Sequence, residues 1–317
     1  MHDLAIIIVS YKTRDLLDRC LASIFSGNYP FSYQVVVVDN ASGDGTPEMV
    51  VGKYPEVLLI RNDRNNGFSM AKNQGIRRTD SRHVLLLNPD TEVEPETLIS
   101  MTRFLNGHPH VGTVGCQLLN SDGSFQTSWF GFPIPMSRFF ENRSLYPRVS
   151  HYLLGIKDMH PGIDEDGARR VDIVKGACMM IRRETINQVG LLDENSFLCA
   201  DDIDWCIRTR RKGWETYVLT SHNMLHHGYA SADQEPYLTI TSSMRSELYL
   251  YRKHYPVTFV AAWSFFVYLE VLYKYLLNGV RIRSGRDDEY TRARFMAYRE
   301  MAGGIFRVRD RAGGTKI

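Results

Sequence analysis

Four short, uninterrupted apolar runs recur through the first hundred residues, and segments with helical spacing of apolar residues separate them. The runs are Leu4–Val9, Val35–Val38, Val57–Ile60 and Val84–Leu87. A continuous apolar run of this length is typical of a strand buried on both faces of a parallel sheet. We therefore predict four strands of one sheet.

The segments between these runs predict helices. Behind Thr13, a candidate N-cap, apolar residues recur at three-to-four spacing over residues 16–25, as in an amphipathic helix. Further helices are expected near residues 46–53, 69–78 and 95–105. Strand–helix alternation at this spacing predicts a doubly wound α/β sheet.

Residues 124–170 lose this alternation. They hold a group of aromatic residues and prolines: Trp129, Phe130, Phe132, Pro133, Pro135, Phe139 and Phe140. Irregular segments of this length are usually binding loops, lids or disordered chain, and the aromatic residues favour a substrate-facing loop over core. Regular structure is expected to return in four elements: strands at Val171–Val174, Ala177–Ile181 and Thr216–Leu219, and a helix from about Asp202 to Lys212.

Charge and cysteine content narrow the class of protein. The 317 residues include 38 Lys/Arg and 36 Asp/Glu, a balance that argues against nucleic acid as a partner. Five cysteines, with no CxxC pair, make a disulfide framework or zinc ribbon improbable and favour a reducing compartment. The chain starts directly on an apolar strand, without a signal-peptide pattern, so we expect a cytoplasmic protein.

The C-terminal part is basic and aromatic. From Arg245 onward there are 14 Lys/Arg and 7 Asp/Glu, and Val257–Leu269 is wholly apolar or weakly polar. Glu270 and Lys274 interrupt the pattern before the roughly 20 apolar residues of a spanning helix are reached. We favour a helix in a membrane interface, with basic residues 281, 283 and 286 facing anionic lipid. The alternative is a helix buried against the rest of the protein.

Polar side chains follow the predicted strands where each of them ends. The first strand is followed by Ser10 and Tyr11, and the later ones by Asp39, Asn40, Asn62, Asn88 and Asp90. Ligands of open α/β sheets bind beyond the carboxyl ends of the strands, so this edge is the candidate site. The first turn has no G-x-G-x-x-G pattern, which disfavours a dinucleotide cofactor.

Three acidic residues are candidates for chemistry. Asp39 can accept a hydrogen bond from a base imide N–H or a ribose hydroxyl, and Asp90 is a hard oxygen ligand suited to Mg²⁺ or Mn²⁺. Either could instead belong to an ordinary turn. Asp202 lies in the acidic first turn of a predicted helix, where the helix dipole alone would favour it. Apolar residues 197–200 precede it, however, and a partly desolvated carboxylate can act as a general base.

Taken together, these segments resemble a family 2 glycosyltransferase of the GT-A fold, in the branch with bacterial rhamnosyltransferases. This resemblance implies a Rossmann-like mixed sheet flanked by helices. The matching pieces are IIIVSYK (6–12), VVVVDNASGDGT (35–46), NDRNNGFSMAKNQG (62–75), LLLNPDTEV (85–93), KGACMMIRR (175–183), GLLDENSFLCADDIDWCIRTRRKGW (190–214), HHGYAS (226–231) and RSELYLYRKHYP (245–256). They span about 250 residues in the family's order.

The resemblance implies a role for each matching residue. Donor binding would involve Ser10, Tyr11, Asp39, Asn65, Gly67, Phe68, Lys72 and Asn88. Asp90 and His226 would hold the metal, Mg²⁺ or Mn²⁺, and Asp202 would be the catalytic base. Acceptor contacts are expected from Asp201, Trp129 and Arg208.

The chain departs from the family pattern at three positions. Asn88 stands for the first Asp of the DXD motif, Asp201 for the usual Glu beside the base, and Lys12 for the usual Asn. The QxxRW motif of processive synthases is missing, which points to transfer of a single sugar.

The resemblance also implies the reaction. We expect inverting transfer of one sugar, from dTDP-L-rhamnose or a UDP-sugar, onto a polyprenyl-diphosphate-linked saccharide at the inner face of the membrane. Residues 1–244 would form the transferase domain, with a nucleotide-sugar half to about 120 and an acceptor half beyond it, and 245–317 a basic helical extension. A nucleotidyltransferase is disfavoured by the missing phosphate-binding Gly-rich signature. A catalytically inactive homologue acting as a membrane-associated assembly partner stays open.

Overall fold

The computed structural model describes residues 1–133, 167–228, 235–285 and 287–304 of the chain. These residues form two compact units, which we describe separately. The sheet unit comprises the described residues within 1–132, 160–194 and 201–231. The helical unit comprises 195–200 and most of the chain beyond 232. Most of the predicted aromatic loop, including Phe139 and Phe140, lies outside the described residues.

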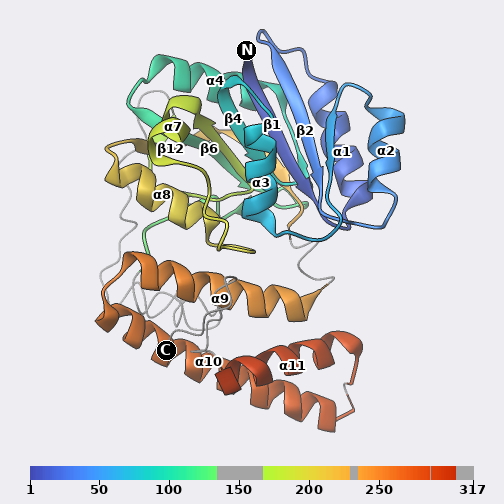
Figure 1. The fold of residues 1–317 in the computed structure, drawn as a ribbon, viewed down its shortest axis with the longest axis vertical. Coiled ribbons are helices and arrows are strands. Elements are labelled where there is room, and N and C mark those ends of the chain that lie inside the picture. Colours follow the sequence, from blue (N-terminus) through green and yellow to red (C-terminus); the bar gives the residue numbers. More distant parts are fainter. Residues whose placement is uncertain (134–166, 229–234, 286, 305–317) are drawn as a thin grey trace. The chain divides into compact units, whose positions relative to one another are not determined.

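Four parallel strands form the N-terminal half of the sheet. They are β1 (His2–Ser10), β2 (Tyr33–Asp39), β3 (Leu58–Arg61) and β4 (Ser81–Leu87), in the order β3-β2-β1-β4 (Figure 1). All four predicted strands are confirmed, within three residues at each end. Ser10 pairs with Asp39 in the parallel register of β1 and β2. The polar residues at these carboxyl ends are therefore neighbours in space.

The other half of the sheet is mixed. β11 (Cys178–Arg182) runs antiparallel between β4 and β6 (Val111–Leu119), and β12 (Glu215–His226) runs parallel to β6. The short β5 (Thr91–Glu92) pairs antiparallel with the end of β12. The minor strands of this sheet are β7 (Phe125–Gln126), paired with β6, and β9 (Ala168–Arg170), paired with β12. β8 (Trp129–Phe130) and β10 (Ile173–Val174) pair with each other in a separate two-stranded sheet.

This half differs from the prediction in several features. Of the strand expected at Val171–Val174, only Ile173–Val174 is observed as a strand, β10. The strand expected to end at Leu219 continues to His226, across an irregularity between Leu219 and Asn223. The sequence pattern did not reveal β6, because its two glycines weaken the strand signal. Gly115 is required there, since a Cβ would lie 2.3 Å from Cγ1 of Val174.

Helices cover both faces of the sheet. One face, with Leu4, Ile6 and Ile8 of β1, packs with α1 (Arg14–Phe25), α2 (Thr46–Lys53) and α4 (Pro95–Gly107). The other face packs with α3 (Phe68–Arg77), α7 (Arg183–Val189) and α8 (Asp201–Arg211). Thr13 does occupy the N-cap position of α1, but its side chain makes no capping bond, because its hydroxyl lies 3.0 Å from that of Ser10. The predicted mixed α/β sheet with flanking helices is confirmed.

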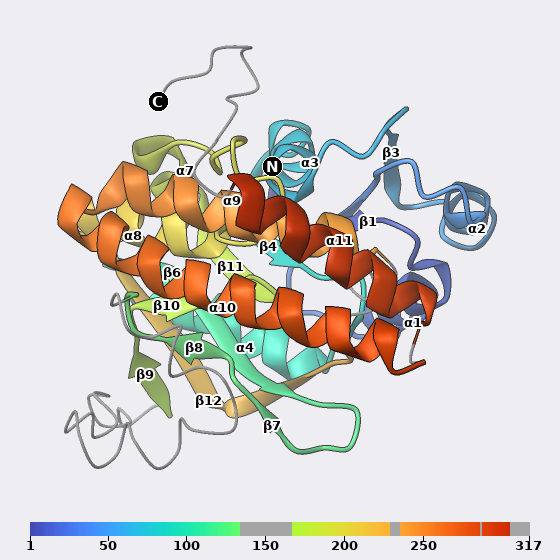
Figure 2. The same cartoon turned by 90° about the horizontal axis from the view of Figure 1, so that it is seen from below.

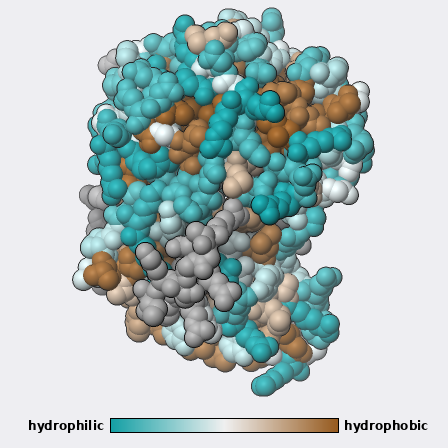
Figure 3. All heavy atoms as spheres, viewed as in Figure 1, coloured by the Kyte–Doolittle hydropathy of each residue, from teal (hydrophilic) through white to brown (hydrophobic). Residues whose placement is uncertain are grey.

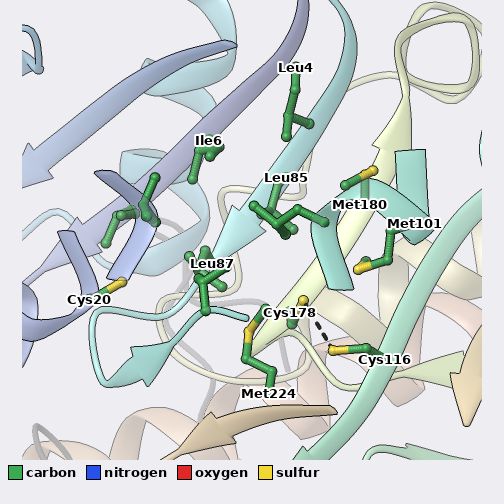
Figure 4. Packing of buried hydrophobic residues seen from close by; sticks show 14 of the residues in the cluster. Leu4, Ile6, Cys20, Leu85, Leu87, Met101, Cys116, Cys178, Met180 and Met224 are labelled. Carbon is green, nitrogen blue, oxygen red and sulfur yellow. Dashed lines mark hydrogen bonds between the residues drawn. The ribbon is translucent and has the colours of Figure 1, made fainter. Parts of the chain in front are cut away.

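The core of the first face holds much of the chain's sulfur. Met101, Met180 and Met224 pack around Leu85 and Leu87 of β4, as Figure 4 shows. In the same cluster the Cys116 thiol donates to Cys178 Sγ at 3.7 Å. This buried layer covers β4, β11, β6 and β12, which are neighbours in this order, and the candidate site lies at the carboxyl end of β4.

The helical unit contains α9 (Pro236–His254), α10 (Val257–Arg283) and α11 (Glu289–Gly304). α10 and α11 lie side by side in Figures 1 and 2, with the rings of Tyr275 and Phe295 stacked 4.9 Å apart. Arg245 of α9 forms an ion pair with Glu300 of α11. The predicted C-terminal helical region is confirmed. Residue 244, after which we expected the domains to divide, lies inside α9, and the division stays a prediction.

α10 has two apolar faces. Trp263, Val267 and Val271 are buried on one face, where the Trp263 ring contacts the Tyr251 ring of α9. The opposite face exposes seven large apolar side chains, which we call the α10 stripe: Val257, Phe265, Tyr268, Leu269, Tyr273, Leu276 and Val280. Figure 3 shows apolar surface on this unit. Among the described helices, α10 alone is long and apolar enough to cross a membrane.

Candidate functional site

One part of the candidate site lies beyond β1 and β2. Ser10 and Asp39 are buried, and the Asp39 Oδ2 accepts from the Ser42 amide at 3.3 Å. Asp39 Oδ1 is buried too, with no hydrogen-bond partner among the described residues. An unsatisfied buried acceptor costs roughly 1–3 kcal/mol, so this atom is suited to a ligand donor. Tyr11, the residue that follows Ser10, is half-buried.

Asparagine side chains next to Asp39 form a hydrogen-bonded network. Asn40 donates to Asn65 Oδ1 and to the Gly67 carbonyl, each at 3.2 Å, and accepts from Asn62 at 2.8 Å. Asn65 in turn accepts from the Gly67 amide. Gly67 has φ +84°, a conformation that favours glycine, and it precedes Phe68, the first residue of α3. Asn40, which the sequence analysis placed at this edge without assigning it a role, therefore holds several segments of the site together.

The departure at Lys12 has a conformational consequence. Lys12 has φ +55°, in the left-handed region, and its amide donates to Ser42 Oγ at 3.0 Å. Asparagine, the family's usual residue here, tolerates this conformation better than lysine does.

We predict that Lys12→Asn raises the free energy of unfolding by about 0.5–1 kcal/mol, because it relieves part of the left-handed strain. Urea denaturation measures this change. Lys12→Ala is the control, since it removes the cation–π contact with Tyr11 and keeps the strain. An Asn variant no more stable than the Ala variant would contradict the prediction.

The structure brings Asp90 and His226 together, although 136 positions separate them. Thr91 pairs with His226 in the ladder of β5 and β12, and the His227 amide donates to the Asp90 carbonyl at 2.9 Å. His226 Nε2 lies 3.4 Å from Asp90 Oδ1 and 3.3 Å from Asn88 Nδ2. Burial raises the pKa of Asp90, but the neighbouring His226, a backbone hydrogen bond and His227 together outweigh burial and hold this pKa below its usual value.

These two side chains fit a divalent cation. A carboxylate oxygen and an imidazole nitrogen 3.4 Å apart can both reach one ion at bond lengths of about 2.1 Å. Among the described residues, no group of three or more His, Cys, Asp or Glu side chains forms a closed metal site. A metal here would therefore take its remaining ligands from bound substrate and water.

The candidate base, Asp202, lies at the start of α8. Its Oδ2 accepts from the Gly176 amide at 2.9 Å and its Oδ1 from the Ile203 amide at 2.8 Å. Burial raises the pKa of Asp202 to about 6, and the Asp201 carboxylate adds to the rise, whereas the Gly176 bond and the Lys72 ammonium oppose it. A carboxylate with this pKa is ionised at neutral pH and still basic enough to accept a proton.

Lys72 and Asp201 form a buried ion pair. Lys72 Nζ lies 2.8 Å from Asp201 Oδ2, and their side chains are 4% and 8% exposed. Lys72 Nζ also lies 5.4 Å from the ring centroid of Phe68. We expected Lys72 at the donor diphosphate and Asp201 at the acceptor. The structure joins these two residues directly, beside Asp202 in the sequence, and both expected roles stay predictions.

Residues 175–177 contact both Asp202, the candidate base, and the segment that carries the Asp90–His226 pair. The sequence pattern assigned these three residues no role. The Gly176 amide binds Asp202, and the Ala177 carbonyl accepts from the Asn88 amide at 2.9 Å. A Cβ at Gly176 would lie 3.3 Å from Cβ of Asp202, closer than most such contacts. Burial lowers the pKa of Lys175, while Asp202 and Asp90 both oppose that shift. Through these contacts, residues 175–177 link the segments that carry the Asp202 and Asp90 carboxylates at one edge of the sheet.

The two remaining acceptor candidates are placed differently. Trp129 pairs with Val174, next to Lys175, so it lies near this edge. Arg208 does not: its guanidinium binds Asp204 at 2.7 Å and the carbonyls of Val189 and Leu191. These bonds fasten α8 to the end of α7, and the structure does not bring Arg208 to Asp202.

The chain matches known proteins over most of its length. The family model described as Glycosyl transferase family 2 matches residues 5–189. An N-acetylglucosaminyl-diphospho-decaprenol L-rhamnosyltransferase of Mycobacterium tuberculosis is 28% identical over 253 residues, covering 74% of this chain and 78% of the relative. The low-salt glycan biosynthesis hexosyltransferase Agl10 of Haloferax volcanii is 29% identical, covering 67% of this chain and 63% of the relative.

Solved structures share the fold. A mannosyltransferase of Pyrobaculum calidifontis, in complex with GDP-Man and Mn²⁺, has a TM-score of 0.56 and 16% identity, covering 96% of this chain and 87% of that one. GalNAc-T7, with UDP, GalNAc and Mn²⁺, has a TM-score of 0.52 and 12% identity, covering 71% of this chain and 43% of that one. At these identities the likeness establishes the fold alone.

Proposed function

The chain belongs to glycosyl transferase family 2, and from this premise we propose that it is an inverting rhamnosyltransferase which acts on a lipid-linked saccharide. The donor would be dTDP-L-rhamnose and the acceptor a polyprenyl-diphosphate-linked sugar. The observation that carries the proposal is that Gly176 binds the Asp202 carboxylate while the next residue, Ala177, binds the Asn88 amide, two residues before Asp90 of the Asp90–His226 pair. The similarity to the mycobacterial rhamnosyltransferase supports the choice of donor and acceptor.

In the proposed reaction, Asp202 accepts the proton of the acceptor hydroxyl as that oxygen attacks the anomeric carbon. The new C–O bond forms on the face opposite the leaving group, and the bond to the diphosphate oxygen breaks with its electron pair. One displacement inverts the anomeric centre. The Gly176 and Ile203 amides hold the Asp202 carboxylate in place, which preorganises the base.

The donor would be held at both ends. Asp39 Oδ1, which lacks a partner among the described residues, would accept the imide N–H of thymine or uracil. At the diphosphate end Asp90 and His226 would hold Mg²⁺ or Mn²⁺, and Asn88 lies beside them. A bound divalent cation neutralises charge on the leaving diphosphate. We propose that Lys72 contributes to donor binding and that Asp201, its ion-pair partner, contacts the acceptor. We propose that Trp129 contacts the acceptor as well.

The test is an assay of nucleoside diphosphate release. Purified protein is incubated with dTDP-L-rhamnose or a UDP-sugar, with and without a polyprenyl-diphosphate-linked N-acetylglucosamine. Release that depends on acceptor, with transfer of one sugar, supports the proposal, and the preferred nucleotide identifies the donor. Binding of the donor without release in any combination would establish the inactive homologue instead.

We further propose that the α10 stripe docks the enzyme on the inner face of the cell membrane, where a lipid-linked acceptor is available. Its exposed aromatic and aliphatic side chains follow one face of a 27-residue helix. Arg281 and Arg283 lie in the last turn of α10, and Arg286 lies outside the described residues. Because Glu270 and Lys274 form an ion pair on the same helix and its other face is packed, we favour an interfacial helix over a spanning one.

We predict that the full chain co-sediments with anionic liposomes and that the triple variant Arg281/Arg283/Arg286→Glu binds about 100-fold more weakly, at roughly 1 kcal/mol per basic residue. Binding should also weaken with added salt, because screening shortens the range of the charges. Leu269→Ser/Leu276→Ser should lower binding as well, whereas Val51→Ser, at an exposed valine of α2, should not. Equal binding by wild type and the triple variant would overturn electrostatic docking.

A further inference from the structure

The Gln126 side chain makes four hydrogen-bond contacts beside the Asp90–His226 pair. Neither the sequence pattern nor the proposed reaction assigns Gln126 a role. It is the second residue of β7, opposite Leu118 of β6. Its Nε2 donates to Asn120 Oδ1 at 2.9 Å and to the His226 carbonyl at 3.1 Å. Its Oε1 lies 2.8 Å from Lys175 Nζ and 2.6 Å from His226 Nδ1. Both ends of this amide are therefore engaged.

The contacts fix which end of the amide is which. A backbone carbonyl only accepts, so the atom facing the His226 carbonyl must be the NH₂ group. A lysine ammonium only donates, so the atom facing Lys175 must be the oxygen. The Asn120 amide is oriented independently, because its Nδ2 donates to the Phe125 carbonyl and leaves Oδ1 for Gln126.

This orientation determines the tautomer of His226. Gln126 Oε1 has no hydrogen, so the short contact with His226 Nδ1 requires that Nδ1 carry one. In the neutral ring Nε2 then carries a lone pair, which can accept from Asn88 Nδ2 at 3.3 Å. That atom is the one that faces Asp90 Oδ1 and Asn88 Nδ2.

We propose that Gln126 is a positioning residue for the metal site: it holds His226 in the Nδ1–H tautomer and aims the Nε2 lone pair at the place where Asp90 would bind the cation. Lys175 orients Gln126 through the shared oxygen. Metal-binding histidines commonly donate their second N–H to an oxygen that fixes the ring. The proposal rests on the proposed role of Asp90 and His226 and adds the group on which that role depends.

The test measures Mn²⁺ binding rather than turnover. Free Mn²⁺ is followed by electron paramagnetic resonance as the metal is titrated into the metal-free protein. Gln126→Leu, similar in volume but without an acceptor, should weaken Mn²⁺ binding about 10- to 100-fold. Gln126→Glu, which keeps an acceptor oxygen, should retain most of the affinity. Phe125→Ala, at the exposed neighbour on β7, is the matched control and should bind as wild type does.

A double-mutant cycle separates positioning from a general effect on the fold. Gln126→Leu should weaken binding in the wild-type background and add no further loss to His226→Ala. A similar loss in both backgrounds, or no loss in either, would overturn the proposal while leaving the metal site in place. If His226→Ala itself binds Mn²⁺ as wild type does, the metal role of His226 fails, and the role of Gln126 with it.

The tautomer can be observed directly. Long-range ¹H–¹⁵N correlation spectra of the metal-free protein, labelled at histidine, distinguish Nδ1–H from Nε2–H rings. The His226 signals are identified by their loss in His226→Ala. The wild type should show Nδ1–H, and Gln126→Leu should populate the other tautomer. An Nε2–H ring in the wild type would contradict the proposal without affecting the assignment of Asp202.

Discussion

Replacing Asp202 with asparagine should lower kcat by about 10²–10⁴-fold, the usual contribution of a general base. Asparagine is nearly isosteric, and its side-chain oxygen can still accept from the Gly176 amide that now binds Asp202 Oδ2. It cannot take a proton from the acceptor hydroxyl. Donor binding, measured by calorimetry, should be unchanged. Turnover within about threefold of wild type would show that the base lies elsewhere.

The pH dependence follows from the raised pKa of Asp202. The base must be ionised to act, so kcat/KM of the wild type should fall as the pH decreases through about 6. The residual activity of Asp202→Asn should lack this acidic limb. A wild-type profile that stays flat down to pH 4.5 would contradict the assignment.

Stability gives an independent check of the same residue. A carboxyl group whose pKa is raised from 3.8 to about 6 on folding stabilises the protein in its protonated form, below pH 3.8. That contribution is lost as the pH rises through 6. Asp202→Asn should therefore not lower the melting temperature at pH 7–8. Asp204→Asn is the matched control: it breaks the 2.7 Å ion pair with Arg208, so it should lower the melting temperature and spare more of the turnover.

Removing Asp90, the proposed metal ligand, should weaken binding of the nucleoside diphosphate at least about tenfold, a difference of about 1.4 kcal/mol. Binding of the free nucleoside should change little, because its base is expected at Asp39 rather than at the cation. Calorimetry of Asp90→Ala with dTDP and with thymidine, in the presence of Mn²⁺, compares the two. Excess EDTA should abolish turnover of the wild type.

Glu92→Gln provides the control for this experiment. Glu92 lies two residues from Asp90 and binds His227 Nε2 at 2.8 Å, so its replacement perturbs the same short strand without removing the proposed ligand. It should leave the ratio of the two affinities unchanged. Full activity in EDTA, or an equal loss of diphosphate and nucleoside binding in Asp90→Ala, would contradict a metal site at Asp90.

The sequence by itself determined the parallel half of the sheet and the composition of its polar edge. The runs at β1, β2, β3 and β4 are continuous and apolar, because a strand covered on both faces has no polar side. Their spacing requires crossovers of helical length. Parallel strands end at one edge, so Ser10, Asp39 and Asn88 could be assigned to a common site before any contact was known. The departure at Lys12 was also visible, but its left-handed backbone was not.

Only the tertiary structure decided how the second half of the chain completes that edge. His226 meets Asp90 because β12 continues past its irregularity and pairs with the two-residue β5, and a two-residue strand leaves no periodic signal. The amide of Gln126 contacts His226 because β7, which carries it, pairs with β6. Lys72 forms an ion pair with Asp201, which is 129 positions away in the sequence. Local patterns report which face of an element is apolar. Pairings between distant, short and irregular segments depend on backbone hydrogen bonds, which every residue type except proline can make in full. The sequence therefore predicted the ligand-binding edge, whereas the partners of each side chain at that edge came from the packing of the whole sheet.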